Sequence, residues 1–164
     1  MIKITVFTAT YNRAQRLKEL YASLKAQNYD FFEWLVVDDG SEDSTEVLVK
    51  EWEKEAAFPI RFVKQQNSGK HIAINRGVQF AKGEIFFIVD SDDVLRTDVL
   101  KEIEGIFRHA IKNYNGLLAG ISGLSETRDG CVIGTTFSAR YENEYTSFLD
   151  WKKDGVVGDK AEVF

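Results

Sequence analysis

The chain reads Gly83-Glu84-Ile85-Phe86-Phe87-Ile88-Val89-Asp90-Ser91-Asp92-Asp93 at the stretch that decides its fold. The five apolar residues Ile85–Val89 predict a strand buried on both faces, because a half-buried strand would alternate polar and apolar side chains. Three carboxylates follow within four residues, and their repulsion must be relieved by water, by basic side chains or by a hard metal ion. Two alternatives follow: a metal site that meets phosphate, or an acidic loop that caps the next helix.

Strands and helices alternate along the first two thirds of the chain. Three more buried strands are predicted at Ile2–Thr8, Trp34–Val37 and Ile60–Val63. Helical periodicity predicts helices over Ala14–Gln27, from near Ser44, over about Lys70–Lys82 and after Thr97. Asp43 and Glu46 have the spacing of a capping box, and Gly83 is the expected C-terminal stop of the third helix. This order predicts an α/β fold, Rossmann-like, with a mostly parallel sheet flanked by helices.

The pattern changes after Tyr114. Leu117–Leu124 and Cys131–Phe137 flank the turn sequence Arg128-Asp129-Gly130, which predicts two antiparallel strands. Ala161–Phe164 looks like the start of another strand. We therefore expect one domain over residues 1–164, with an antiparallel C-terminal extension.

Composition excludes several classes of protein. The chain has 164 residues, 44% of them hydrophobic, and a net charge of −5, which argues against a general nucleic-acid binder. Its single cysteine, Cys131, excludes an internal disulfide framework and a multi-cysteine zinc site, and we expect it to be a small core residue. No apolar run reaches membrane-spanning length and no signal region opens the chain. The expected setting is cytoplasmic, with peripheral association at the inner face of the membrane as an open alternative.

Polar side chains gather where the predicted strands end. The carboxyl ends of parallel strands meet at one edge of a sheet, which is where such sheets bind ligands. Tyr11 offers a face on which a base can stack, and Asp39 offers an acceptor for a base or ribose hydrogen. Lys70 suits phosphate, and the acids of Asp90–Asp93 suit Mg²⁺ or Mn²⁺ bridging two phosphates. The mixture predicts a nucleotide-diphosphate ligand.

Four motifs follow one another along the first part of the chain. They are Ala9–Arg13, Val36–Thr45, Asn67–Gly77 and Val89–Asp93. In order and spacing they resemble, over residues 2–95, the successive motifs of family 2 glycosyltransferases of the GT-A fold. One departure is Ala9, where that family usually has proline. A C-terminal segment, Gly158–Val163, is also similar to bacterial members that make surface polysaccharides.

The resemblance implies a role for each matching residue. The loop of Ala9 and Tyr11 would hold the base together with Asp39, and Lys70 would lie near the phosphates. Asp90-Ser91-Asp92 would be the family's Asp-X-Asp motif. The implied donor-binding residues are Ala9, Tyr11, Arg13, Asp39, Lys70 and Asp90, and the implied metal ligands are Asp92, which we favour, and Asp93. A solvated Arg13 is the alternative for that residue.

The resemblance also implies a reaction. It is metal-dependent transfer, with inversion, of a sugar from a nucleotide-diphosphate donor, expected to be a UDP-sugar, to a glycan or lipid-linked acceptor in cell-surface polysaccharide synthesis. Residues 1–114 would be the donor-binding half, and residues 115–164 the start of a truncated acceptor half. The family's general base lies beyond the segment that resembles Gly158–Val163, which leaves Asp159, or else Glu162, as the candidate within the chain.

Two rival functions stay open. A nucleotidyltransferase would share the sheet and metal, but the chain has Thr8–Arg13 where such enzymes carry a glycine-rich basic loop. A non-catalytic nucleotide-sugar-binding scaffold is the second rival. A dehydrogenase is disfavoured, since no Gly-x-Gly-x-x-Gly follows the first strand. The oligomeric state is left open.

Overall fold

A twisted sheet forms the centre of the structure. The computed structural model describes residues 1, 3–113, 121–124, 126–127, 129–131 and 160–163. The four strands that precede residue 90 pair in parallel in the order β3-β2-β1-β4, which confirms the predicted parallel sheet. Their bounds are β1 Ile4–Thr10, β2 Phe32–Asp38, β3 Ile60–Lys64 and β4 Ile85–Ile88. At the β4 edge, β6 (Lys160–Val163) pairs antiparallel with β4 and with β5 (Ile121–Leu124).

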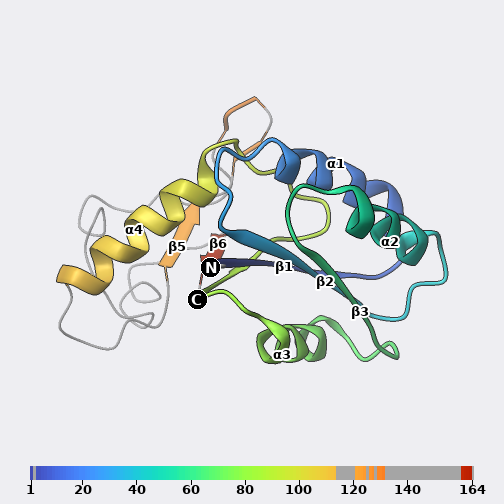
Figure 1. Cartoon of the computed structure of the whole chain (residues 1–164). Helices are drawn as coiled ribbons and strands as arrows, with labels where there is room; N and C mark the ends of the chain where they lie inside the picture. Colours follow the sequence, from blue (N-terminus) through green and yellow to red (C-terminus); the bar gives the residue numbers. More distant parts are fainter. Residues whose placement is uncertain (2, 114–120, 125, 128, 132–159, 164) are drawn as a thin grey trace.

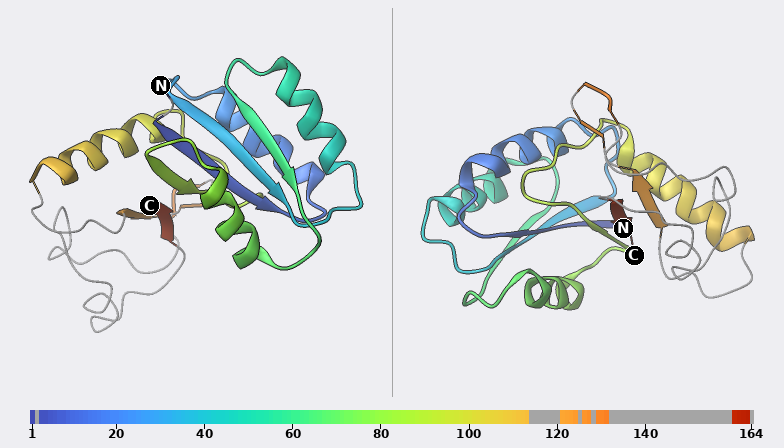
Figure 2. Two further views of the ribbon diagram at one scale, coloured as in Figure 1. Left: turned by 60° about the horizontal axis from the view of Figure 1, so that its bottom comes forward. Right: turned by 180° about the vertical axis from the view of Figure 1, so that it is seen from behind.

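Helices cover both faces of the sheet (Figures 1 and 2). On one face α1 (Ala14–Lys25), α2 (Thr45–Glu55) and α4 (Val99–Asn113) contribute to a single core cluster. On the other face α3 (Lys70–Phe80) packs over a smaller cluster. The predicted helices are thus confirmed, with ends that differ by a few residues.

The strands are apolar on both sides because each side faces helices. In β1, Ile4 and Val6 face the larger cluster, whereas Phe7 faces the smaller one. A Cβ atom on Gly77 of α3 would lie 2.3 Å from the Phe7 ring, so glycine lets the helix approach the sheet closely. The prediction of fully buried strands is confirmed at these positions, all completely buried.

The expected role of Gly83 is wrong. The helix ends at Phe80, and its C-cap is Ala81, whose N–H donates to Gly77. Gly83 instead passes so close to β1 that a Cβ atom would lie 2.4 Å from the Thr5 nitrogen. A glycine is required here by close approach of two backbones and not by a left-handed helix end.

An ion pair between buried Glu33 and partly exposed Arg61 ties the strands together beneath α3. Glu33 is fully buried and accepts two hydrogen bonds from Arg61, at 2.8 and 2.9 Å. Its carboxylate also accepts from the Thr5 hydroxyl at 2.7 Å and from the Lys82 backbone N–H at 2.8 Å. The charge is therefore compensated by neighbours from β1, β3 and the α3–β4 connection.

The C-terminal part bears on three expectations. A turn is present at the predicted place, because the Thr127 N–H donates to the Cys131 carbonyl at 2.8 Å and Gly130 has a φ of +83°. Cys131 is exposed, so its expected core position is wrong. The strand expected after it, residues 132–137, lies outside the described residues. None of the helices in the described ranges has the length and apolar character that a bilayer crossing requires.

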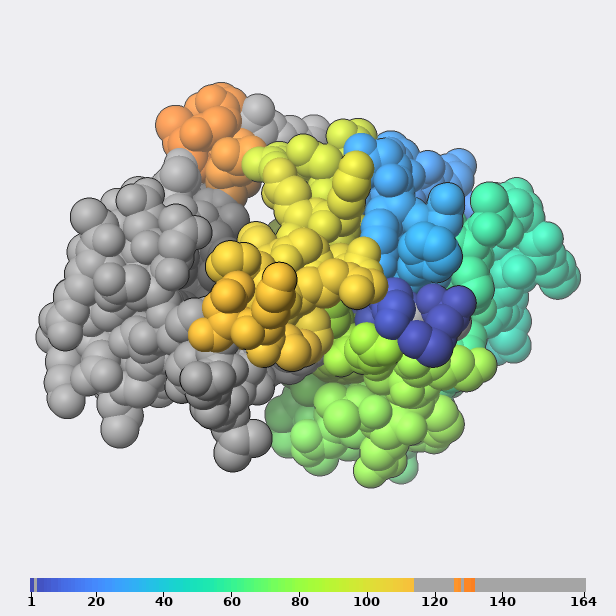
Figure 3. Space-filling model, turned by 60° about the vertical axis from the view of Figure 1, so that its left-hand side comes forward, coloured from blue at the N-terminus to red at the C-terminus, as the bar shows by residue number. Residues whose placement is uncertain are grey.

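The opposite edge of the sheet carries a small cavity. A space of about 290 Å³ lies at the starts of β1 and β4, beside α4. Figure 3 shows α4 in yellow next to the dark-blue start of the chain on this face. The cavity is lined by Lys3, Glu84, Ile85, Glu104, Phe107, Arg108, Ile111 and Lys112.

Candidate functional site

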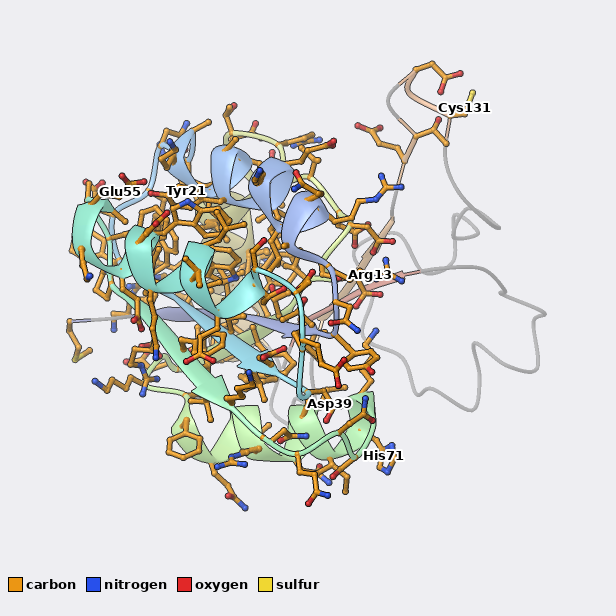
Figure 4. All side chains as sticks on the ribbon, turned by 90° about the vertical axis from the view of Figure 1, so that its right-hand side faces the viewer. Arg13, Tyr21, Asp39, Glu55, His71 and Cys131 are labelled. Atoms are coloured by element: carbon orange, nitrogen blue, oxygen red, sulfur yellow. The ribbon has the colours of Figure 1, made fainter. Side chains whose placement is uncertain are left out.

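The loops after β1, β2 and β4 and the start of α3 meet at the carboxyl edge of the sheet, as the sequence predicts. We call this edge, formed by residues 9–13, 38–43, 65–71 and 89–93, the rim. Backbone hydrogen bonds align it, for example from the Asp39 N–H to the Thr10 carbonyl at 2.8 Å. Figure 4 shows Arg13, Asp39 and His71 along this edge, well away from Tyr21 and Glu55.

Asp39 anchors the loop that leads into α3. Its Oδ1 accepts from the Gln65 amide at 2.7 Å and from the Ser68 N–H at 2.8 Å, and its Oδ2 accepts from the Gly69 N–H at 2.8 Å. Burial raises the pKa of this carboxyl, but these hydrogen bonds and the His71 charge lower it by more than burial raises it. The net effect is a pKa below the usual 3.8. Only 6% of Asp39 is exposed. Its hydrogen bonds therefore position Gly69 and Lys70, and it is also the residue predicted to contact the nucleotide base.

Asp38 and Ser41 join the first two rim loops. The fully buried Asp38 accepts hydrogen bonds from the Ser41 N–H and hydroxyl. Ser41 Oγ accepts from the Asn12 N–H at 2.8 Å, and Asn12 Oδ1 accepts from the Glu42 N–H at 2.8 Å. These contacts hold Asn12 at a φ of +52°, which fixes the path of the chain between Tyr11 and Arg13.

Asp43 does more than the expected capping box. Its Oδ1 accepts from the Thr45 N–H at 3.0 Å at the start of α2, while its Oδ2 accepts from the Ala14 N–H at 3.1 Å at the start of α1. Burial raises the pKa of Asp43, but the hydrogen bonds lower it by a larger amount, so the net pKa lies below the usual 3.8. Glu46 bonds to Lys50 and Lys64 instead of closing the box, so that part of the prediction is wrong.

The residues expected to touch a base lie at the rim with different exposure. Tyr11 is 47% exposed, so its ring is open to stacking by a planar ligand. Ala9 is partly buried at the end of β1. Beside them, Thr10 Oγ1 and Gln65 Oε1 are buried atoms without a hydrogen-bond partner among the described residues.

Basic side chains from other loops pair with the acidic loop after β4. Lys70 Nζ lies 2.6 Å from Asp90 Oδ1, and Arg13 Nη1 lies 2.6 Å from Asp92 Oδ2. All four side chains are 45–55% exposed. The Asp93 N–H donates to the Asp90 carbonyl at 3.1 Å, which closes the loop into a turn.

The donor set of this loop fits a hard divalent cation. Carboxylates at Asp90, Asp92 and Asp93 are the oxygen ligands that Mg²⁺ and Mn²⁺ prefer, and the first two are accessible to solvent. In the described ranges no three such groups already surround a single point. Instead, Asp90 pairs with Lys70 and Asp92 with Arg13. The favoured metal ligand Asp92 is therefore brought together with a predicted donor-binding residue, and two other predicted donor-binding residues pair with each other.

Sequence reasoning missed the residues that hold the rim together. Asn12, Gln65 and Asp43 connect loops that lie 26–30 residues apart in sequence, and Gln65 also helps to orient Asp39. Their polar side chains next to strand ends were the available signal, but periodicity does not say which partner such a side chain will find. The candidate base Asp159 lies outside the described residues, and for Glu162 the structure describes the backbone only.

The chain is also similar to known proteins. A family model described as "Glycosyl transferase family 2" matches residues 5–149. An uncharacterized glycosyltransferase, alr2836, from Nostoc sp. is 33% identical over 107 residues, which cover 65% of this chain and 33% of that protein. The chain thus spans about a third of this relative's length.

Two solved structures are similar over most of the chain. The crystal structure of Staphylococcus aureus TarS 1–349 in complex with UDP has a TM-score of 0.68 and 25% identity, and the match covers 86% of this chain and 40% of that one. The mannosyltransferase PcManGT from Pyrobaculum calidifontis, in complex with GDP-Man and Mn²⁺, has a TM-score of 0.59 and 26% identity, with coverage of 76% and 36%. The fold is therefore shared with enzymes whose structures contain nucleotide ligands.

Proposed function

The chain belongs to glycosyl transferase family 2, and we propose that its rim binds a nucleotide-diphosphate sugar and transfers the sugar, with inversion, to an acceptor hydroxyl. One observation carries the proposal. Four strand-end loops join into a single polar edge, crossed by the Arg13–Asp92 and Lys70–Asp90 ion pairs. Such an edge presents an exposed aromatic ring, two cations and carboxylates, the kinds of group that a nucleotide diphosphate needs.

Each part of the donor has a candidate partner. The exposed ring of Tyr11 stacks on the base, beside Ala9, and Asp39 accepts a hydrogen from the base or ribose. Lys70 and Arg13 bind the diphosphate oxygens, because both lie on the rim and carry charges that match phosphate. The TarS complex contains UDP, which supports a UDP-sugar as the donor.

The acidic loop is the proposed metal site. Asp92 and Asp93, with Asp90 beside them, would hold Mg²⁺ or Mn²⁺, and the Mn²⁺ in the PcManGT complex supports this choice of ion. When bound, such an ion neutralises negative charge on the departing diphosphate. Arg13 and Lys70 add their own charge to the same group.

Inversion follows if the acceptor attacks from the face opposite the diphosphate. The acceptor oxygen then forms its bond to the anomeric carbon as the bond to the phosphate oxygen breaks, and that electron pair leaves with the diphosphate. A base must take the hydroxyl proton, and Asp159 is the candidate. The acceptor is a glycan or lipid-linked molecule of cell-surface polysaccharide synthesis, reached from the cytoplasmic side of the membrane. Residues 115–164 would begin the acceptor half of the enzyme.

Calorimetry with UDP, GDP and TDP in the presence of Mn²⁺ tests the donor site. We expect UDP to release heat, and an Asp92→Ala variant to bind UDP without Mn²⁺ dependence while unfolding like the parent. The matched control is Asp98→Ala, whose carboxylate pairs with Arg96 on the surface. Absence of heat with all three nucleotides at millimolar concentration would overturn the proposal. Release of free sugar from UDP-sugars would separate an enzyme from a binding scaffold.

A further inference from the structure

Two ion pairs cross the rim at the place where a donor diphosphate is expected. Arg13 belongs to the start of α1 and Asp92 to the loop after β4, 79 residues further along the chain. The guanidinium lies 2.6 Å from one carboxylate oxygen, and both side chains are 47% exposed. Neither side chain is held by burial, so the pair can open without disturbing the core.

We propose that Arg13 is an exchangeable counter-ion of Asp92, which leaves that carboxylate for the donor diphosphate when a divalent cation binds. This inference rests on the proposed function. It assigns Arg13 a specific task, namely to make the binding of the metal and the binding of the diphosphate depend on each other.

The physical argument starts from charge. A guanidinium on one oxygen of Asp92 disfavours a divalent cation at the same carboxylate, because the two cations repel each other at short range. Metal binding therefore weakens the Arg13–Asp92 ion pair. A diphosphate restores a partner to the freed guanidinium, and arginine binds phosphate oxygens with paired hydrogen bonds.

The same logic applies at the neighbouring pair. Lys70 Nζ lies 2.6 Å from Asp90, so both carboxylates of the Asp-X-Asp motif are neutralised by cations from other loops. Lys70 follows Gly69, whose N–H is bound by Asp39, and is thus placed by a fixed loop. Arg13 is placed by Asn12 and by the Asp43 cap on Ala14. The backbone next to both cations is thus held by hydrogen bonds, and the exchange from carboxylate to phosphate would be a movement of their exposed side chains.

Mn²⁺ bound at Asp92 frees Arg13 for the diphosphate, and a diphosphate bound at Arg13 frees Asp92 for Mn²⁺. The two ligands therefore bind with positive coupling, which is the same whichever binds first. An exposed ion pair contributes little, so removing Arg13 should strengthen binding of Mn²⁺ alone by about two- to fivefold. The same change should weaken UDP binding in the presence of Mn²⁺. The factor by which UDP tightens Mn²⁺ should fall by about threefold or more.

The experiment measures free Mn²⁺ by electron paramagnetic resonance, with and without UDP, in the parent protein, Arg13→Ala and Arg16→Ala. Arg16 is the matched control, because it carries the same charge one helical turn away. Arg13 and Arg16 both line a cavity of about 410 Å³ at the start of α1. Urea unfolding of each variant checks that the fold is retained. Opposite changes in Mn²⁺ and UDP affinity in Arg13→Ala, absent from Arg16→Ala, support the exchange.

Other outcomes are decisive in the opposite direction. Equal effects of Arg13→Ala and Arg16→Ala would reduce the result to general electrostatics and overturn the exchange. An unchanged coupling factor in Arg13→Ala would overturn it as well, while the donor site would stand. Absence of Mn²⁺ binding together with metal-free UDP binding would overturn both the exchange and the metal site. Absence of UDP binding would overturn the proposed function itself.

Discussion

Replacing Asp39 by alanine removes the acceptor of three hydrogen bonds at once. The Gln65 amide and the Ser68 and Gly69 N–H groups would lose their partner. Hydrogen bonds to a charged group are each worth about 1.5–3 kcal/mol. Since the loop is only partly buried, water can satisfy some of the freed donors, and we expect a loss of about 2–4 kcal/mol in unfolding free energy. Asp39→Asn keeps one oxygen but turns an NH₂ group toward N–H donors, so we expect about 1–2 kcal/mol.

Urea unfolding with an unchanged m-value gives these differences. Amide hydrogen exchange at Ser68 and Gly69 reports the loop directly, and it should accelerate in both variants. Asp98→Ala is the comparison, because its carboxylate is 47% exposed in a surface ion pair just before α4, and we expect a smaller loss of about 0.5–1 kcal/mol. If Asp39→Ala unfolds within about 0.5 kcal/mol of the parent protein, the anchoring role assigned to this carboxylate is refuted.

The remaining predictions concern acid stability, the buried pair and two glycines. The pKa of Asp39 is lowered in the folded state, so its contribution to stability is present above the ordinary value of 3.8 and is lost as pH falls through the lower folded value. In acid titrations followed by circular dichroism, Asp39→Ala should therefore lose stability less steeply than the parent protein. An equally steep loss would contradict the lowered pKa. Glu33→Ala should cost about 2–4 kcal/mol in urea unfolding, since it leaves Arg61, which is partly exposed, without its partner, and a loss below about 1 kcal/mol would show that the pair is dispensable. Gly83→Ala should destabilise the fold by about 1–3 kcal/mol, because the new methyl group would meet the β1 backbone. Gly105→Ala has open space at its Cβ position in α4 and should stabilise the fold by about 0.5–1 kcal/mol. Similar thermal shifts for both glycine variants would refute the close approach at Gly83.

The parallel sheet could be predicted because its strands are apolar without alternation. The run Ile85–Ile88 predicts only a strand buried on both faces. Helical periodicity in α1 and α4 predicts the alternation of strands and helices. Gly83 could not be interpreted correctly, because a glycine before a strand looks the same in sequence whether it ends a helix or passes close to another backbone. Cys131 was misplaced for a similar reason, since the hydrophobicity of a single residue does not decide its burial.

The rim could be predicted as a place, but its internal contacts could not. Topology alone brings the ends of parallel strands together, so Tyr11, Asp39, Lys70 and Asp92 were expected near one another. The pairing of Arg13 with Asp92 over 79 residues of sequence depends on side-chain directions, which no periodicity encodes.

Nuclear magnetic resonance mapping of UDP with Mg²⁺ on the ¹⁵N-labelled protein tests the central claim most directly. We predict that the amide signals of Tyr11, Asp39, Gly69 and Asp92 shift in a saturable way, while those lining the cavity at the opposite edge, such as Lys3 and Glu84, stay in place. Saturable shifts confined to that opposite edge, or none at millimolar UDP, would contradict the assignment of the rim as the nucleotide site.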